Sequence, residues 1–385
     1  DRILLARIHK ETIAELQKQI KPVSKNEFMN WLFSWQHLTP VTQLYGDYGV
    51  QTVINQMEGY EIAASAWEEH ILPARIQNYN PESLDNLTLK GTLGWGRLSL
   101  HPAIIRSMQK EEENTSDTSP RRIAPTSVSP VTFYDRAKTD WAIFRQDKAD
   151  ISCLNTTTRK VYECLEKNGA SFFLDIVRKT KLLKSEVETA LWELVTAGLA
   201  TADHFDNLRA LINPKRRAGL GKYKKKARPR DATGRWSLLY ADSLEEIHDT
   251  NIETICWILL RRYGIVFRDL LARESNLPQW RDLLYMFRRL EDQGRVRGGR
   301  FVSGFEGEQY ALPEAVESIR ATGNYDYGAT SYAHHNSRYS SNWSITISSY
   351  DPLNLVGIII PGDKIATNSN KKIVFENGKV VNVYD

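Results

Sequence analysis

The most regular alternation of apolar and polar positions lies between Gly234 and Pro313. Apolar residues recur there at helical spacing in two runs, which Gly264 separates, and a third run follows Pro278. The three runs are Ile255, Ile258 and Leu259, then Leu270 and Leu271, then Leu283, Leu284, Phe287 and Leu290. After Gly294, the stretch RVRGGRFVSGF has the glycines and alternating residues of a short hairpin. Three helices followed by a hairpin predict a winged helix.

Arginine is concentrated on the third helix and on the hairpin of this predicted domain. The residues are Arg281, Arg288 and Arg289 on the helix and Arg295, Arg297 and Arg300 on the hairpin. Winged helices place these two elements against DNA, and the planar donor fork of arginine suits phosphate and base contacts. We therefore expect these residues to bind DNA. The alternative is a solvated basic face in a protein-interaction module.

An internal duplication is visible in residues 152–212. The segment LEKNGASFFLDIV aligns with LLRRYGIVFRDLL, and in both copies a glycine precedes a phenylalanine by the same distance, Gly198 to Phe205 and Gly294 to Phe301. The first copy has an acidic third helix, SEVETALWELV, in place of the arginines. We interpret the first copy as structural and the second as the copy that faces DNA.

A basic run, residues 214–230, holds nine Lys and Arg and no acidic residue. We interpret it as a linker or arm between the two copies that would add salt-dependent affinity for nucleic acid. A nuclear-localisation signal is the other interpretation of such a run. The candidate contacts here are Lys215, Arg216, Arg217, Lys224, Lys225 and Lys226, with Arg235 and Trp236 in the GRWSLL segment that follows.

Residues outside the two copies predict a helical beginning and a β-rich end. In FMNWLFSWQHL, one helical face holds Phe28, Trp31, Leu32 and Trp35. Trp35, Gln36 and His37 form either a polar site at the end of this helix or a core tryptophan beside a capping pair. Near the other end, β-branched residues and an Asn377-Gly378 turn predict a small β-barrel or sheet.

Composition excludes several classes of protein. The 385 residues are 41% hydrophobic and 25% charged with a net charge of +4, as in an ordinary protein of several domains. Three scattered cysteines fit neither a disulfide framework nor a metal site, so we expect no bound metal. We see no apolar run long enough for a bilayer and no basic-then-apolar leader, and we expect a cytoplasmic protein without membrane contact.

The chain resembles the C-terminal extension of the long-form Lhr (large helicase-related) superfamily 2 helicases. The segments that match this family in order include FSWQHLTP, LTLKGTLGWGRLS, GASFFLDIV, RYGIVFRDLLARE, GGRFVSGFEGEQYALPEAV and DPLNLVGIIIPG. The helicase motor is missing, because the chain has no G-x-x-x-x-G-K-[ST] loop. We therefore expect no cofactor here, with ATP and Mg bound by the motor of the parent protein.

The resemblance implies an α+β fold, mostly helical, with tandem winged helices after a helical domain and a small C-terminal β-barrel, similar to AlkZ-type DNA glycosylases. We place the boundaries as follows: 1–108 helical or winged-helix-like, 109–150 acidic loop and extended linker, 151–213 structural winged helix, 214–233 basic linker, 234–322 DNA-facing winged helix, 323–385 β-barrel. The expected partners are single-stranded or forked DNA and the N-terminal motor of the same polypeptide, with a second copy of the chain as a further candidate.

Two functions follow from the resemblance: a DNA-binding region of a DNA-repair helicase, or a uracil-DNA glycosylase that acts on a flipped base. Glycosylase chemistry requires a carboxylate near the sugar. Asp351, at a strand break before Pro352, is our candidate for it, while Asp before Pro is also a common turn former. The weaker rivals are Asp326 and Asp385, and the candidate assisting residues are Asn354 and His335 of the pair His334-His335.

Overall fold

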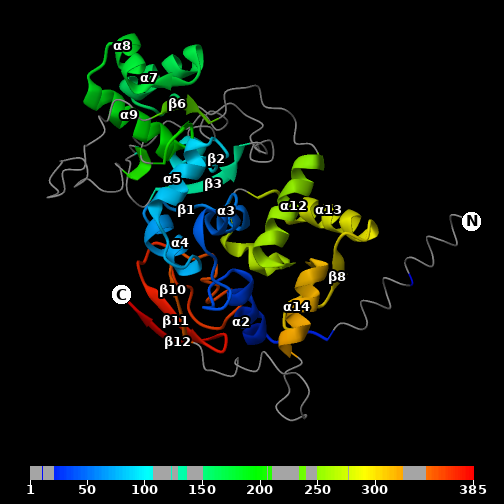
Figure 1. Ribbon diagram of the computed structural model, residues 1–385. Helices are drawn as coiled ribbons and strands as arrows, with labels where there is room; N and C mark the ends of the chain where they lie inside the picture. The colour runs from blue at the N-terminus through cyan, green and yellow to red at the C-terminus, as the bar shows by residue number, and fades with distance from the viewer. Residues whose placement is uncertain are drawn as a thin grey trace, which may run out of the picture. The chain divides into compact units, whose positions relative to one another are not determined.

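The computed structural model describes residues 11, 21–106, 123, 129–136, 151–205, 207–209, 234–239, 249–275, 277–323 and 344–385. The chain divides into two compact units. One unit holds residues 44–251 and 275–277, and the other holds residues 1–43, 252–274 and 278–385. We describe the two units separately, with the element labels of Figure 1.

The first unit begins with a winged helix, in the region that the sequence analysis describes as helical or winged-helix-like. Its helical elements are α3 (Gly46–Gln56), the π-helical turn η1 (Trp67–Ile71), α4 (Leu72–Arg75) and α5 (Pro81–Leu89). Its strands are β1 (Ile62–Ala63), β2 (Leu93–Gly96) and β3 (Pro130–Asp135). The third helix, α5, starts where the Asn80 side chain accepts a hydrogen bond from the Glu82 amide at 3.0 Å.

The second winged helix of this unit repeats the same order. It consists of α7 (Thr156–Asn168), β4 (Ser171–Phe172), α8 (Phe173–Thr180), α9 (Lys184–Ala197), β5 (Ala200–Ala202) and β6 (Arg235–Leu238). Asn155 caps α7, because its side chain accepts from the Thr158 amide at 2.8 Å. Figure 1 shows α7, α8 and α9 gathered beside β6.

The other unit contains the third winged helix. It consists of α12 (Asp249–Tyr263), β7 (Ile265–Val266), the 3-10 helix η4 (Arg268–Arg273), α13 (Trp280–Asp292), β8 (Arg297–Gly299) and β9 (Gln309–Ala311). This arrangement confirms the three helices expected from the apolar pattern. The hairpin differs from the prediction, because β8 pairs with β9 rather than turning back within RVRGGRF. The wing is therefore the connection between these two strands.

The sheets of the three winged helices have the same strand order. The orders are β1-β3-β2, β4-β6-β5 and β7-β9-β8, so the last strand in sequence is always the central one. Residues 130–135 therefore complete the first sheet, although the sequence pattern assigned them to a linker. Residues 235–238 complete the second sheet, although the pattern assigned GRWSLL to the third winged helix. The acidic segment 109–120 and the basic run 214–230 themselves lie outside the described residues.

The helix α2 (Lys25–Trp35) belongs to the unit of the third winged helix, whereas the sequence grouped it with residues 1–108. The Trp35 indole donates to the Arg261 carbonyl at 3.0 Å, and the Gln36 amide donates to the Arg262 carbonyl at 2.9 Å. Gly264 allows this packing, because a Cβ there would collide with the Trp31 ring, and its φ of +66° favours glycine. Gln36 is fully buried and satisfied by the backbone, as a capping residue would be.

A three-stranded antiparallel sheet ends the chain. Its strands β10 (Ser344–Ser348), β11 (Lys372–Glu376) and β12 (Lys379–Tyr384) lie side by side in Figure 1. The predicted Asn377-Gly378 turn joins β11 to β12. The described strands form an open sheet and no closed barrel, which corrects the expectation of a barrel. The Phe33 ring of α2 packs edge-on against Phe375 of this sheet, 5.1 Å between centroids.

Of the helices within the described residues, none combines the length and the apolar composition needed to cross a membrane. The helix α14 (Pro313–Gly323) follows the third winged helix and accepts a hydrogen bond at Ser318 Oγ from the Trp31 indole, 3.0 Å away. This contact adds α14 to the packing around α2.

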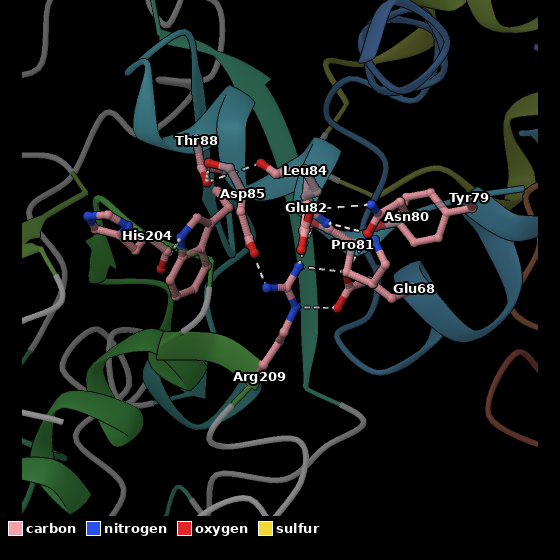
Figure 2. Close-up of polar contacts among 11 residues, drawn as sticks. Glu68, Tyr79, Asn80, Pro81, Glu82, Leu84, Asp85, Thr88, His204 and Arg209 are labelled. Carbon is pink, nitrogen blue, oxygen red and sulfur yellow. Dashed lines mark hydrogen bonds and ion pairs between the residues drawn. The ribbon is translucent and has the colours of Figure 1, made fainter. Parts of the chain in front are cut away.

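A buried ionic cluster joins the first two winged helices within their unit (Figure 2). The Arg209 side chain lies 8% exposed and donates two bonds to Glu68, at 2.6 and 2.7 Å, and one to Asp85 at 2.5 Å. Tyr79 donates its hydroxyl to Glu68 at 2.9 Å, and burial together with this carboxylate raises the pKa of Tyr79. The same carboxylates raise the pKa of Arg209 against the opposing effect of burial. All three nitrogens of the Arg209 guanidinium therefore donate hydrogen bonds within this cluster.

We expect Arg209→Ala to destabilise this unit by about 3–5 kcal/mol, because it leaves two carboxylates without their buried cation. The measurement is the midpoint of denaturant unfolding of the full chain. The matched control is Arg178→Ala, since Arg178 is 77% exposed in an i,i+3 pair with Asp175 and should contribute about 0–1 kcal/mol. Equal shifts for the two variants would contradict a structural role for the cluster.

Candidate nucleic-acid interface

The surface of α13 that points away from the core is a stripe of charged residues around one aromatic side chain. The buried face is formed by Leu283, Met286, Phe287 and Leu290. The exposed stripe is formed by Arg281, Tyr285, Arg288 and Arg289. The Arg281 side chain is 86% exposed, and its Nε lies 3.6 Å from Asp282 Oδ1. The spacing of four, three and one residues puts all four on one side of the helix, as the sequence predicted for the arginines.

Arg288 is held in place by a carboxylate of the wing. Its Nε and Nη2 donate to the two oxygens of Glu308 at 3.0 and 2.7 Å, and the Tyr310 hydroxyl donates to the same carboxylate at 2.5 Å. The hydrogen bond from Arg288 holds the pKa of Glu308 below its usual range. An anionic ligand would therefore compete with Glu308 for this guanidinium.

Arg295 is likewise paired, at the turn between α13 and β8. Its Nη1 donates to Glu253 at 2.5 Å, and its guanidinium lies 4.6 Å from the centroid of the Trp257 ring. The Trp257 indole donates to the same carboxylate at 3.2 Å. Arg295 thus ties the turn to α12, and only part of its donor fork faces solvent.

Arg297 and Arg300 have no ion pair among the residues that the structure describes, and both side chains are exposed. Arg297 is the first residue of β8, and Arg300 begins the wing. The wing is rigid at its base, because the Gln309 side chain accepts from the amides of Phe301 and Val302 at 2.9 and 2.8 Å. These two arginines are therefore accessible to a phosphate.

A glycine allows the wing to approach α13. The Gly298 amide donates to Glu291 Oε1 at 3.1 Å, and a Cβ at this position would overlap that carboxylate. At the start of the wing, the Val23 amide donates to the Phe301 carbonyl at 2.8 Å, and the Ser303 amide donates to the Val23 carbonyl at 2.9 Å. The segment before α2 therefore holds this part of the wing through backbone hydrogen bonds.

The basic run 214–230 lies wholly outside the described residues, and with it the predicted contacts Lys215, Arg216, Arg217, Lys224, Lys225 and Lys226. Arg235, just after the run, donates to Asp203 Oδ2 at 3.0 Å, and Arg136 reaches Asp203 Oδ1 at 3.3 Å. Burial acts to raise the pKa of Asp203, but these hydrogen bonds hold it below its usual range. Because β5 and β6 are neighbours in one sheet, the run connects two strands of a single winged helix and does not link two domains.

Trp236 is a core residue, which corrects its prediction as a nucleic-acid contact. Its side chain is 5% exposed and packs edge-on against Trp192, 5.6 Å between ring centroids. It stands on β6, the central strand, so alternate side chains of this strand point into the domain. The sequence segment GRWSLL did not reveal this orientation.

The third helices of the first two winged helices differ from α13. In α9, every residue from Ala190 to Ala197 is buried, and Glu193 binds Thr158 and Asn155 at 2.5 Å each. Glu193, one of the acidic residues of the segment SEVETALWELV, is therefore an interior hydrogen-bond acceptor and not a surface charge. In α5, the charged residues are Glu82 and Asp85, both acidic. Among the three third helices, only α13 presents arginine to solvent.

Asp351 lies in a closed turn. It is 1% exposed, and its Oδ1 accepts from the Leu353 amide at 2.9 Å. Asn354 is fully buried and donates to the carbonyls of Ser349 and Ile365 at 2.9 and 3.1 Å. This is the geometry of an Asx turn. Asp326, His334 and His335 lie outside the described residues, and Asp385 is exposed at the last position.

Within the residues that the structure describes, no group of three or more His, Cys, Asp or Glu is placed to hold a metal ion.

The sequence pattern did not reveal three residues of the arginine surface of the third winged helix: Glu253, Tyr285 and Glu308. The two carboxylates pair with arginines 42 and 20 residues away, and no local pattern signals such pairs. Tyr285 was detectable, since it falls four residues after Arg281 on the predicted helix.

Two segments of the chain match family models of the winged-helix domains of the large helicase-related (Lhr) protein. Residues 23–106 match the model of the third such domain, and residues 245–329 match that of the fourth. The first segment contains α2 and the helices of the first winged helix but ends before β3, and the second contains α13 and the wing of the third winged helix.

Two curated relatives are similar to most of the chain. One, from Mycolicibacterium smegmatis, is named "Lhr helicase/ probable uracil glycosylase" and is 28% identical over 343 residues, which is 83% of this chain and 21% of the relative. The other, from Escherichia coli K12, is named "Lhr helicase/uracil glycosylase" and is 26% identical over 396 residues, 92% of this chain and 23% of the relative. The chain thus spans less than a quarter of the length of these relatives.

Among solved structures, the chain is similar to the Streptomyces sahachiroi DNA glycosylase AlkZ. The TM-score is 0.49 at 12% identity, with 95% of this chain and 88% of AlkZ covered. A likeness at this level says nothing of function.

We expect Asp351→Ala to lower the free energy of unfolding by about 1–3 kcal/mol, because the buried Leu353 amide loses its acceptor. Asp351→Asn keeps the accepting oxygen and should cost less. Chemical denaturation of the two variants measures the difference. Asp363→Ala is the control, since Asp363 is exposed in the same segment and should change stability by less than about 0.5 kcal/mol. Equal stability of Asp351→Ala and Asp363→Ala would contradict the turn assignment.

Proposed function

The chain has two winged-helix domains of the large helicase-related family, and from this premise we propose that it is the DNA-binding C-terminal region of an Lhr-type DNA-repair helicase. The relatives are named helicases and are more than four times as long as the matched part. The sequence has no phosphate-binding G-x-x-x-x-G-K-[ST] loop, so ATP and Mg would be bound by a motor elsewhere on the same polypeptide. DNA, single-stranded or forked, is the proposed ligand.

The observation that supports DNA binding most directly is the solvent-facing arginine surface of the third winged helix. Arg281 on α13, Arg297 on β8 and Arg300 at the start of the wing are exposed, and the Gln309 side chain holds the base of the wing. Guanidinium groups bind phosphate through two parallel hydrogen bonds, and a fixed scaffold reduces the entropy lost on binding. This surface therefore fits a polyanion.

The other two winged helices would have supporting roles. The C-terminal half of α9 is buried, and Arg209 is bonded to Glu68 and Asp85 of the first winged helix, so neither is available to a ligand. The basic run between β5 and β6 would add affinity that is independent of sequence and falls steeply with salt.

We expect the double variant Arg297→Ala, Arg300→Ala to weaken DNA binding at every sequence tested. The slope of log affinity against log salt should fall by about 0.9 for each lost contact to duplex phosphate, or about 0.7 on a single strand. Arg288→Ala should have a smaller effect, because Glu308 already occupies its donor fork. Binding titrations at several salt concentrations measure both quantities.

Arg178→Ala is the matched control for these titrations, because Arg178 is an exposed arginine on α8 of a different winged helix. It should leave affinity and slope unchanged. If the wing variant also binds DNA with the wild-type affinity and slope, the arginine surface is not the DNA-binding site.

Uracil excision is the second candidate function, and it is favoured by the names of both curated relatives. We propose Asp351 as its carboxylate, which would stabilise positive charge on the sugar after the base is flipped out. The closed turn around Asp351 weighs against this role, since the carboxylate is 1% exposed and one oxygen already accepts from the backbone.

This second candidate predicts that the full chain leaves alkali-sensitive abasic sites in a uracil-containing oligonucleotide and that Asp351→Asn does not. The Asn variant removes the charge and keeps the turn, so loss of excision with normal DNA binding would support the catalytic role. Excision by Asp351→Asn at the wild-type rate would place the carboxylate elsewhere. Absence of excision by the wild-type chain would leave DNA binding as the function of this region.

A further inference from the structure

Tyr285 is an exposed aromatic residue in the middle of the arginine stripe. It is 66% exposed, and within residues 249–275 and 277–323 it is the one large apolar side chain on the surface. It follows Arg281 by one turn and precedes Arg288 and Arg289 by one turn, so basic groups lie on both sides along about 12 Å of helix.

Tyr285 has no part in the core of its domain. The apolar face of α13 is completed by Leu283, Met286, Phe287 and Leu290, and Phe287 stacks on Tyr310 at 5.1 Å between centroids. The helix also begins with Trp280, which packs on Phe287 at 6.3 Å. The ring of Tyr285 points away from these contacts, and a large apolar surface left in water is informative when it lies in a charged ligand-binding face.

The charge of α13 does not suit deep insertion into the major groove of a duplex. Its sequence, WRDLLYMFRRLED, has three arginines and three acidic residues, so the helix has no net charge. A helix in the groove lies between two rows of phosphates and reads bases with free donor forks. Here the fork of Arg288 is bound by Glu308, and Asp282 is partly exposed beside Arg281.

We propose that α13 binds an unpaired nucleotide, with its base stacked on the Tyr285 ring and the flanking phosphates contacted by Arg281 and Arg289. Any base has a face that can stack, so this contact needs no base-edge readout and tolerates the bound fork of Arg288. The proposal rests on the proposed DNA binding and names its substrate class: the single strand, at a fork or beside a duplex.

The test compares the full chain and its variants on a single-stranded oligonucleotide, a blunt duplex of the same sequence and a fork. A base stacked on an aromatic side chain contributes about 1–3 kcal/mol, so Tyr285→Ala should weaken binding to the single strand and the fork by about 5- to 150-fold. Binding to the blunt duplex should stay at the wild-type level. Tyr285→Phe keeps the ring and should bind like the wild type.

Tyr48→Ala is the matched control, because Tyr48 is an 80% exposed tyrosine on α3, outside the arginine stripe. A second readout uses oligonucleotides with abasic positions. Removing bases should weaken DNA binding by the wild-type chain. The Tyr285→Ala variant should bind the abasic and the intact oligonucleotides with nearly the same affinity. Thermal unfolding of each variant confirms that the fold is retained.

Two outcomes overturn the inference: an equal loss on single strand and blunt duplex, which would indicate a groove contact, or no loss on any DNA. In the second case, binding that still depends on salt and on Arg297 and Arg300 would leave the proposed function intact. Only the absence of salt-dependent DNA binding by the wild-type chain would remove the proposed function itself.

Discussion

The antiparallel pairing of the last strand in each winged helix is the interaction on which the rest of the structure depends. β3, β6 and β9 each form backbone hydrogen bonds with strands on both sides, and each occurs last in its domain. No sheet is complete until the chain has passed through its wing. In the first two winged helices, the chain before the central strand therefore connects two strands that are neighbours in one sheet.

The same scaffold serves two purposes in this chain. In the second winged helix, α9 is buried on all sides along its C-terminal half, and Arg209 locks the domain to the first through Glu68 and Asp85. In the third, the equivalent helix buries one face and leaves the other to solvent. The C-terminal half of α9 is therefore closed to a ligand, whereas one face of α13 is open to solvent.

Two carboxylates fix the orientation of arginines on this surface. Glu308 and Glu253 hold Arg288 and Arg295 in fixed directions and remove part of the excess positive charge. Exposed ion pairs of this kind contribute little to stability, which leaves orientation of the guanidinium groups as their main effect. The exposed cations of this surface lie beside Tyr285 on α13, on β8 and at the start of the wing.

The sequence by itself determined the elements that depend on local pattern: the helices of the third winged helix, the break at Gly264, the duplicated glycine-to-phenylalanine spacing and the arginine stripe of α13. Helical periodicity and turn residues act over a few positions, so a single sequence reveals them. Only the tertiary structure decided that residues 130–135 and 235–238 complete earlier sheets, that Trp236 is buried, that α2 packs on Gly264, and that the described C-terminal strands form an open sheet. It also decided that Arg288 is bound by Glu308 and that Asp351 caps a turn. Strand pairing, burial and ion pairs join residues far apart in the chain, and their partners are fixed by the packing of the whole domain rather than by neighbouring residues.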